Sequence, residues 1–295
     1  MSSQFGKVSD GPSGFSQFSS NKYLSGTRDF LESNSLVAKF AFLLLVIVLF
    51  VMALRLGTSL LSWIFSPSPS PILIDGMINA KQMVVIPQDP STSGARPIMR
   101  SVDQVDGMEF TWSVWIYVDD FTYRQDAYKH IFHKGNDDIN TTNVPTGVNQ
   151  PNNAPGLYIT PHTNKLMVIM NTFDTVNEEI IIPDLPLNKW VNVIIRVDDQ
   201  HQLDVYINGT LTKRHMLKGV PKQNYGDVYA SMNGGFSGYT SELRYFDSAL
   251  GTNKINAIVD AGPNMKMSGD DMTKSKPHYL STRWYFAGAN DMYNP

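Results

Sequence analysis

The stretch Val205-Tyr206-Ile207-Asn208-Gly209-Thr210-Leu211 decides the fold class of this 295-residue chain. Its apolar residues flank Asn208-Gly209 on both sides, in short segments of the kind that form strands. Asn-Gly supplies both positive-φ positions of a type I′ turn, which joins neighbouring antiparallel strands. The stretch therefore predicts a β-hairpin.

A period-two pattern of apolar residues extends outward from this hairpin, beginning at about Met83 and interrupted by Asn, Asp, Gly and Pro. Such alternation is typical of strands that bury one face. The predicted strands are Gln82–Ile86, Met108–Val118, His130–His133, Leu157–Thr160, Lys165–Asn171, Glu179–Ile182, Trp190–Val197, Leu203–Ile207, Thr210–Met216, Val228–Met232 and Ser237–Phe246. A short helix is expected only at Asn253–Val259. So many strands with so little helix predict an all-β, antiparallel sandwich over residues 83–262.

A long apolar segment precedes the strands. From Phe40 to Leu54 the sequence FAFLLLVIVLFVMAL has no polar side chain, and its transfer into a bilayer is favourable by about 5 kcal/mol. Fifteen helical residues span only ~22 Å of a ~30 Å hydrocarbon core, so the helix should extend past Lys39 or Arg55. These long cations can reach opposite headgroup layers, and Trp63 suits the far interface. We predict one transmembrane helix within residues 36–65.

A buried core helix and a cleaved signal peptide are the alternatives for this apolar segment, and the sequence disfavours both. Core helices rarely run fifteen residues apolar on every face, as residues 40–54 do. A cleaved signal peptide would place its apolar core closer to the N-terminus and follow it with a small-residue cleavage site. We therefore expect a retained signal anchor.

The charges beside the anchor predict its orientation. Lys22, Arg28 and Lys39 lie on the N-terminal side, whereas Arg55 is the one close cation on the other side before Lys81. Cytoplasmic flanks are enriched in Lys and Arg. The N-terminus is therefore predicted to be cytoplasmic and the C-terminal domain luminal or extracellular.

The remaining segments are polar or irregular. Residues 1–35 are rich in Ser, Gly and Asn and are predicted to form a disordered tail, and residues 66–82 begin with alternating Ser and Pro and are predicted to be a linker. Residues 263–295 are predicted to form an irregular tail containing the aromatic segment Tyr279–Phe286. That segment either packs back on the sandwich or docks on another chain.

Composition excludes several classes of function. The net charge is −3 and the sequence has no basic stripe, which argues against a nucleic-acid partner. The chain has no cysteine, which excludes disulfides, thiolate metal sites and cysteine nucleophiles. The cysteine count does not fix the cellular compartment.

Four stretches carry a resemblance to a known family. In chain order they are Phe110–Val118, Ile131–Gly135, Leu187–Ile195 together with Leu203–Gly209, and Gly235–Phe246 followed by Ala249-Leu250. This order resembles the laminin-G and concanavalin A-like jelly roll over residues 105–262. The chain departs from the family in the insert at 136–155 and after Gly262. Trp112 and Trp190 are expected to fill the sandwich core, because large aromatics on neighbouring strands do so.

Some jelly rolls of this kind hydrolyse glycans with carboxylates arranged as E-x-D-x-E on one strand face. The chain has five glutamates, and the adjacent Glu178 and Glu179 would point to opposite faces of a strand. The sequence has no H-E-x-x-H and no G-x-S-x-G motif. His130 and His133 are also expected on opposite faces, as ordinary surface or rim histidines. We therefore predict no catalytic residues and no enzymatic activity.

The resemblance implies calcium as the candidate cofactor, held at one rim by hard oxygen donors. Candidate ligands crowd one loop, at Asp137, Asp138, Asn140 and Asn143, and a second pair follows a predicted strand, at Asp198 and Asp199. The alternative is that Asp and Asn are there as turn formers. The insert Asp137–Pro155 is a predicted partner-binding edge.

Asn140 and Asn208 begin N-x-S/T sequons and are candidate glycosylation sites in a luminal domain.

These features predict a membrane-anchored, non-catalytic recognition module that binds a glycan or a protein through loops at one rim. The alternative is a structural component of a membrane-associated assembly, with other subunits as partners. This organisation is similar to virion proteins of large DNA viruses, in which the span sits in an internal membrane and the domain faces the shell. A glycan hydrolase is disfavoured.

Overall fold

The computed structural model describes residues 36–66, 68–101, 103–104, 107–142, 145–198 and 201–268. The chain divides into two units at Ser66, which we describe separately. The predicted tail at 1–35 and the aromatic segment Tyr279–Phe286 lie outside the described residues.

In the first unit the structure describes one helix, α3 (Leu36–Phe65). This helix runs through both Lys39 and Arg55, so it continues beyond the apolar segment at each end. Thirty helical residues measure about 45 Å, more than the ~30 Å of a hydrocarbon core. The large apolar side chains along it are exposed. This helix is therefore long and apolar enough to cross a membrane.

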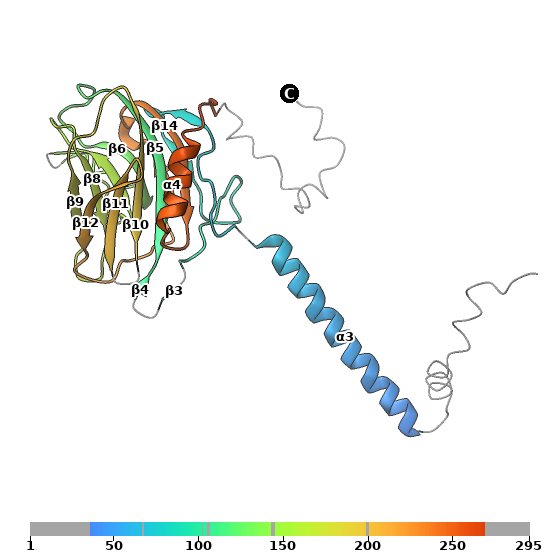
Figure 1. Ribbon diagram of the computed structural model, residues 1–295. Helices are drawn as coiled ribbons and strands as arrows, with labels where there is room; N and C mark the ends of the chain where they lie inside the picture. The colour runs from blue at the N-terminus through green and yellow to red at the C-terminus, as the bar shows by residue number, and fades with distance from the viewer. Residues whose placement is uncertain are drawn as a thin grey trace, which may run out of the picture. The chain divides into compact units, whose positions relative to one another are not determined.

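The second unit is an antiparallel β-sandwich of two six-stranded sheets, which confirms the predicted fold class (Figure 1). The first sheet has the order β1 (Met77–Asn79), β14 (Ser237–Phe246), β5 (Phe110–Asp120), β10 (Trp190–Val197), β11 (Gln202–Ile207) and β12 (Thr210–Met216). The second sheet has the order β2 (Val84–Ile86), β13 (Asp227–Ala230), β6 (Lys129–Gly135), β7 (Gly156–Ile159), β8 (Leu166–Met170) and β9 (Glu178–Ile182). The remaining elements are the hairpin of β3 (Asp103–Gln104) and β4 (Gly107–Met108), the 3₁₀ turn η1 (Met232–Gly234) and helix α4 (Thr252–Ala261).

The hairpin centred on Asn208-Gly209 forms as predicted. Asn208 and Gly209 have φ angles of 48° and 79°, and Ile207 pairs with Thr210 across the turn. The turn joins β11 to β12 at the edge of the first sheet.

The core lies between the sheets, and a smaller apolar layer lies under α4. Trp112 of β5 is buried between Phe132 and Tyr245, with ring centroids 5.2 Å from each. On the outer face of the first sheet, Ile255 of α4 packs against Ile194. Helix α4 thus covers part of that face, as Figure 1 shows.

Trp190 does not fill the core, contrary to expectation. Val191 and Val193 face the second sheet, so strand alternation turns Trp190 to the outer face. There its ring lies 5.6 Å from that of Tyr117.

The sandwich also begins earlier than the predicted boundary at Met83. The carbonyl oxygen of Pro69 accepts a hydrogen bond from the Asp247 N–H at 3.2 Å, and Leu73 and Ile74 are fully buried. Proline lacks only the N–H donor, so its carbonyl can still pair along a sheet edge. Residues 69–82, predicted as linker, therefore belong to the sandwich.

Candidate binding cavity at one end of the sandwich

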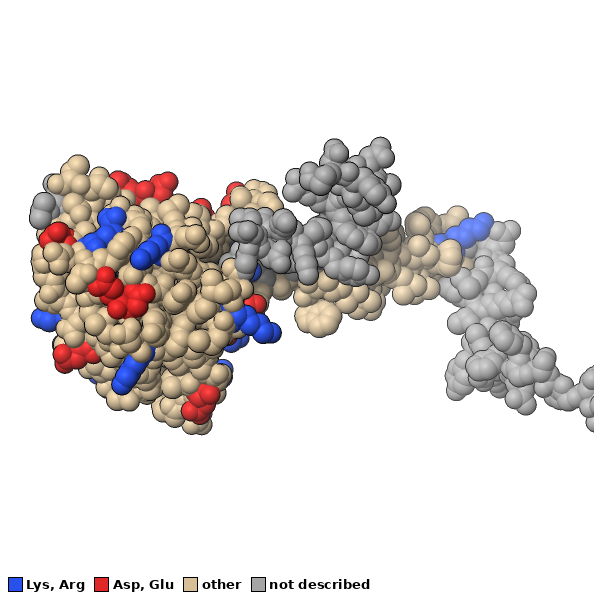
Figure 2. Space-filling model, turned by 90° about the horizontal axis from the view of Figure 1, so that it is seen from above, with Lys and Arg blue, Asp and Glu red and all other residues tan. Residues whose placement is uncertain are grey.

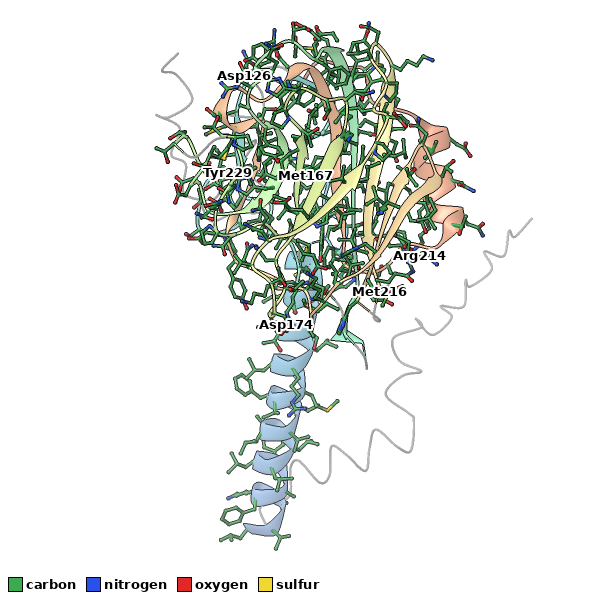
Figure 3. The ribbon with its side chains drawn as sticks, turned by 90° about the vertical axis from the view of Figure 1, so that its left-hand side faces the viewer. Asp126, Met167, Asp174, Arg214, Met216 and Tyr229 are labelled. Atoms are coloured by element: carbon green, nitrogen blue, oxygen red, sulfur yellow. The ribbon has the colours of Figure 1, made fainter. Side chains whose placement is uncertain are left out.

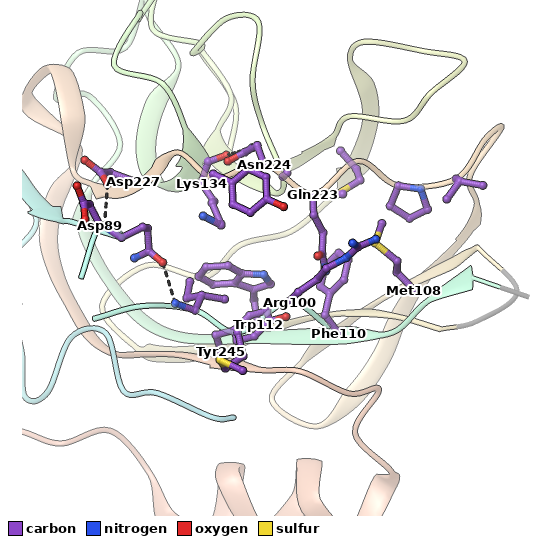
Figure 4. A pocket seen from close by; sticks show the side chains of 18 of the residues that line it. Asp89, Arg100, Met108, Phe110, Trp112, Lys134, Gln223, Asn224, Asp227 and Tyr245 are labelled. Carbon is purple, nitrogen blue, oxygen red and sulfur yellow. Dashed lines mark hydrogen bonds between the residues drawn. The ribbon is translucent and has the colours of Figure 1, made fainter. Parts of the chain in front are cut away.

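A cavity of about 730 Å³ opens at one end of the sandwich (Figure 4). Strands of both sheets and the connections after β2 and after β12 supply most of its lining residues. The lining residues are Gln88, Asp89, Pro90, Ile98, Met99, Arg100, Met108, Phe110, Trp112, Lys134, Ala154, Met170, Phe173, Val220, Pro221, Gln223, Asn224, Tyr225, Asp227 and Tyr245. Its volume falls within the ~300–1,000 Å³ of small-molecule pockets.

The deep wall of the cavity is apolar. Phe110 and Trp112 of β5, Met170 of β8 and Tyr245 of β14 line it and are buried. All four point into the space between the sheets because they occupy core positions of their strands. This wall offers extensive apolar contact and few polar groups, which suits the apolar part of a ligand.

The rim of the cavity carries four exposed apolar side chains beside the exposed, charged residues Asp89 and Arg100. Phe173 is 67% exposed and Tyr225 92%, while Met99 and Val220 are 42% and 37% exposed. Single exposed apolar residues are ordinary, but several around one mouth form a patch that marks an interaction surface. We call these four residues the apolar rim.

The polar groups of the cavity brace the connections that form it. The Lys134 ammonium donates to the Gly226 carbonyl oxygen at 2.6 Å, and burial lowers the pKa of Lys134 to about 8, opposed by Asp227. The Asp227 carboxylate accepts from the Gln88 N–H at 2.8 Å, and the Gln88 side-chain oxygen accepts from the Ile98 N–H at 2.9 Å. These bonds join the connection after β2 to the start of β13, and the connection before β13 to β6.

The candidate calcium ligands do not form a cluster within the part of the chain that the structure describes. Asp137 and Asp138 are exposed, the Asn140 side-chain oxygen accepts from the Thr142 N–H at 3.1 Å, and Asp198 pairs with Arg196 at 3.6 Å. Asn143 and Asp199 lie outside the described residues. Among the residues that the structure describes, no group of three His, Asp or Glu side chains could hold a metal ion. Calcium binding stays a prediction.

The sequons occupy different settings. Asn140 lies half-buried in the insert, and the Asn208 side-chain oxygen accepts from the Asn192 N–H at 2.8 Å in the hairpin turn. Glycosylation at either residue stays a prediction.

The insert that was predicted as a partner-binding edge packs partly onto the sandwich. Its Val148 contacts the cluster of Tyr158, Met167 and Ile169 on the outer face of the second sheet. Its Asn153 is fully buried and accepts from the Tyr158 hydroxyl at 2.6 Å. Burial also raises the pKa of Tyr158. These described residues are therefore part of the fold rather than a free edge.

His130 and His133 are neither on opposite faces nor at the surface, which corrects two expectations. A register shift between His130 and Phe132 inserts an extra residue into β6, so both imidazoles lie on the same outer face. His130 Nε2 lies 2.6 Å from His133 Nδ1, and both residues are at most 1% exposed. Single-strand alternation could not reveal this, because bulges leave no clear mark in one sequence.

Glu178 and Glu179 do face opposite sides of β9, as predicted: Glu178 is buried and Glu179 exposed. The Glu178 carboxylate lies 2.7 Å from His215 Nε2 and accepts from the Lys218 N–H. This carboxylate links β9 to β12 and the segment after it. The adjacent glutamates therefore do not form a paired catalytic site.

A match to a family model assigns the sandwich to a known superfamily. The model described as the concanavalin A-like lectin/glucanases superfamily, of laminin G type, matches residues 93–256, which is more than half of the chain. The chain belongs to this superfamily. No curated protein matches it.

Solved structures of botulinum neurotoxin domains overlap with this concanavalin A-like chain at low identity. The receptor binding domain of the C/D mosaic serotype has a TM-score of 0.41 at 13% identity, covering 52% of this chain and 36% of that one. The serotype D ligand binding domain in complex with N-acetylneuraminic acid has a TM-score of 0.45 at 11% identity, covering 65% and 46%. The chain thus spans less than half the length of those domains.

Proposed function

We propose that the chain is a membrane-anchored, non-catalytic recognition module that binds its ligand at the cavity end of the sandwich. Helix α3 would anchor it as a single-pass protein, with the sandwich on the non-cytoplasmic side. The observation that carries the proposal is the cavity with its apolar wall and exposed apolar rim. Such a site suits the apolar part of a ligand, whether that ligand is a protein or a smaller molecule.

The lack of a paired carboxylate motif supports a non-catalytic role. Glu178 is engaged with His215, and Lys134 donates to a backbone carbonyl, so neither is poised toward a substrate. Charge gives no reason to propose a nucleic-acid partner. On the face shown in Figure 2, acidic and basic side chains are intermixed.

Substitution at the rim tests the cavity. In full-length, detergent-solubilised protein, Phe173→Asp is expected to weaken binding of the apolar fluorescent probe bis-ANS about tenfold, because a charge replaces an exposed apolar contact worth about 1.4 kcal/mol. The matched control is Leu187→Asp, which alters an exposed apolar residue that does not line the cavity. Equal binding by both variants would contradict the proposal.

A second candidate function is glycan binding on the outer face of the first sheet. Trp190, Tyr117 and Tyr239 form one cross-strand row, with ring centroids separated by 5.6 and 6.3 Å. Half-buried aromatic faces with hydroxyl handles suit ligands that are apolar on one side and polar on the other. On a glycan array, full-length protein should lose its signal upon Trp190→Ala. An array with no signal from the parent protein removes this candidate.

A role as a structural subunit of an assembly stays a prediction. If the intact protein purifies only within a larger complex and binds no glycan or apolar probe, that role replaces the recognition proposal. A pull-down of the intact, detergent-solubilised protein is the deciding measurement.

A further inference from the structure

The chain joins the sandwich at the same end as the cavity. The carbonyl oxygens of Pro69 and Pro71 accept hydrogen bonds from the N–H groups of Asp247 and Tyr245, each at 3.2 Å. Tyr245 is itself part of the cavity wall. The first residues of the second unit therefore run beside the cavity rather than at the opposite end of the strands.

The covalent tether between this point and helix α3 is short. Helix α3 ends at Phe65, so only Ser66, Pro67 and Ser68 precede Pro69. Four extended residue steps cover at most about 14 Å. At most about 14 Å of chain therefore connects Phe65 to Pro69.

From these observations we propose that the cavity end rests on the membrane crossed by α3, with the apolar rim in the membrane interface and a lipid acyl chain in the cavity. The inference rests on the proposed membrane anchor. It names the ligand class of the same site: a membrane lipid whose acyl chain contacts the apolar wall.

The chemistry of the rim favours a lipid surface. Phe173 and Tyr225 are the most exposed rim residues, and aromatic side chains concentrate at membrane interfaces. The ammonium of Lys222 lies 5.0 Å from the centre of the Phe173 ring, so a cation accompanies an apolar group, as in interfacial segments.

The absence of cysteine allows a direct test. Tyr225→Cys places a nitroxide at the rim, and Asp126→Cys places the control at the far end of the sandwich, where Figure 3 shows Asp126 opposite Asp174. Full-length protein is reconstituted in phosphatidylcholine vesicles, and collisions with oxygen and with a water-soluble nickel chelate are compared. The oxygen-to-nickel collision ratio is expected to be several-fold higher at position 225 than at 126.

The possible outcomes distinguish a failure of this inference from a failure of the proposed membrane anchor. If an alkaline carbonate wash removes the protein from the vesicles, the anchor and this inference fail together. If the protein is retained but both labels contact water equally, the inference alone fails. A label at 225 that is shielded only after a purified partner protein is added assigns the rim to that protein and also overturns the inference.

Lipid occupancy is measured separately. Native mass spectrometry of full-length protein released from phosphatidylcholine nanodiscs should show one retained lipid. We expect Phe173→Asp to reduce that occupancy about tenfold and Leu187→Asp to preserve it. Equal occupancy in the two variants would place the retained lipid elsewhere on the protein and contradict the proposal.

Discussion

Acidification from pH 7.5 to pH 4 is expected to lower the free energy of unfolding of the sandwich by about 3 kcal/mol through His133 alone. Burial lowers the pKa of His133 from 6.5 to about 4. Each unit of difference between the folded and unfolded pKa corresponds to about 1.4 kcal/mol. Because the folded pKa is the lower one, this stability is complete above pH 6.5 and is lost as the pH falls toward 4.

A chain of hydrogen bonds explains why both histidines stay neutral. The Met232 N–H donates to His130 Nδ1 at 3.0 Å, so the proton of His130 is on Nε2, which donates to His133 Nδ1. His133 Nε2 then donates to the Asn136 carbonyl oxygen at 2.8 Å. A second proton on either ring would place two N–H groups facing each other or break this series of hydrogen bonds. The pKa of His130 is lowered well below 6.5 by burial and by His133.

Among the described residues, no carboxylate forms a hydrogen bond with either histidine. None is therefore placed to stabilise an imidazolium. His130 packs edge-on against Tyr158, and His133 stacks on Tyr229, at centroid distances of 5.3 and 5.1 Å. Both contacts are aromatic, and the pKa values of both tyrosines are raised, so both stay neutral in this range.

The measurement is urea unfolding of full-length protein in detergent, followed by near-ultraviolet circular dichroism between pH 7.5 and pH 4. His133→Gln should be less stable at pH 7.5 and have a shallower pH dependence below 6.5. His162→Asn is the control, because His162 is exposed and Asn tolerates its φ of 55°. An unchanged pH slope in His133→Gln would refute the assignment.

The sequence predicted the fold well because the fold depends on local alternation. Trp190–Val197 and Ser237–Phe246 were predicted with the bounds that the structure gives them, since both are rich in β-branched or aromatic residues and are bounded by turn residues. Strand β1 was missed because Met77–Asn79 is too short to show alternation and follows a proline-rich segment. Trp190 was placed on the wrong face because its size, rather than its position relative to Val191, guided the prediction.

The cavity could not be predicted in the same way. Its rim comes from connections that carry no periodic pattern: Met99 precedes β3, Phe173 follows β8, and Val220 and Tyr225 precede β13. Their proximity depends on sheet order, which joins β13 to β6 and β6 to β7. A single sequence does not encode that order in its local pattern. The one available signal was the length of the connections after β2 and after β12.

The Asp204 carboxylate is the second place where one substitution should have a large effect. Asp204 is fully buried on the outer side of the first sheet. The Arg214 guanidinium donates to both of its oxygens, at 2.8 and 3.1 Å, and Arg196 and Gln202 each donate to Oδ2 at 3.2 Å. Removing the carboxylate leaves Arg196, which is largely buried, without its main anion. Loss of one partner from a buried pair costs about 3–5 kcal/mol.

Asp204→Ala is therefore expected to lower the free energy of unfolding by about 3 kcal/mol, whereas Asp260→Ala, on the exposed side of α4, should change it by less than about 0.5 kcal/mol. The effect should reach α4, because the Arg196 Nε–H also donates to the Leu250 carbonyl oxygen at 3.1 Å, just before that helix. Hydrogen exchange of α4 amides should accelerate in Asp204→Ala and stay at the parent rate in Asp260→Ala. Unchanged exchange together with a stability loss below about 1 kcal/mol would show that Arg196 does not depend on this carboxylate. The packing of α4 would then depend on the apolar cluster of Ile194, Leu250 and Ile255.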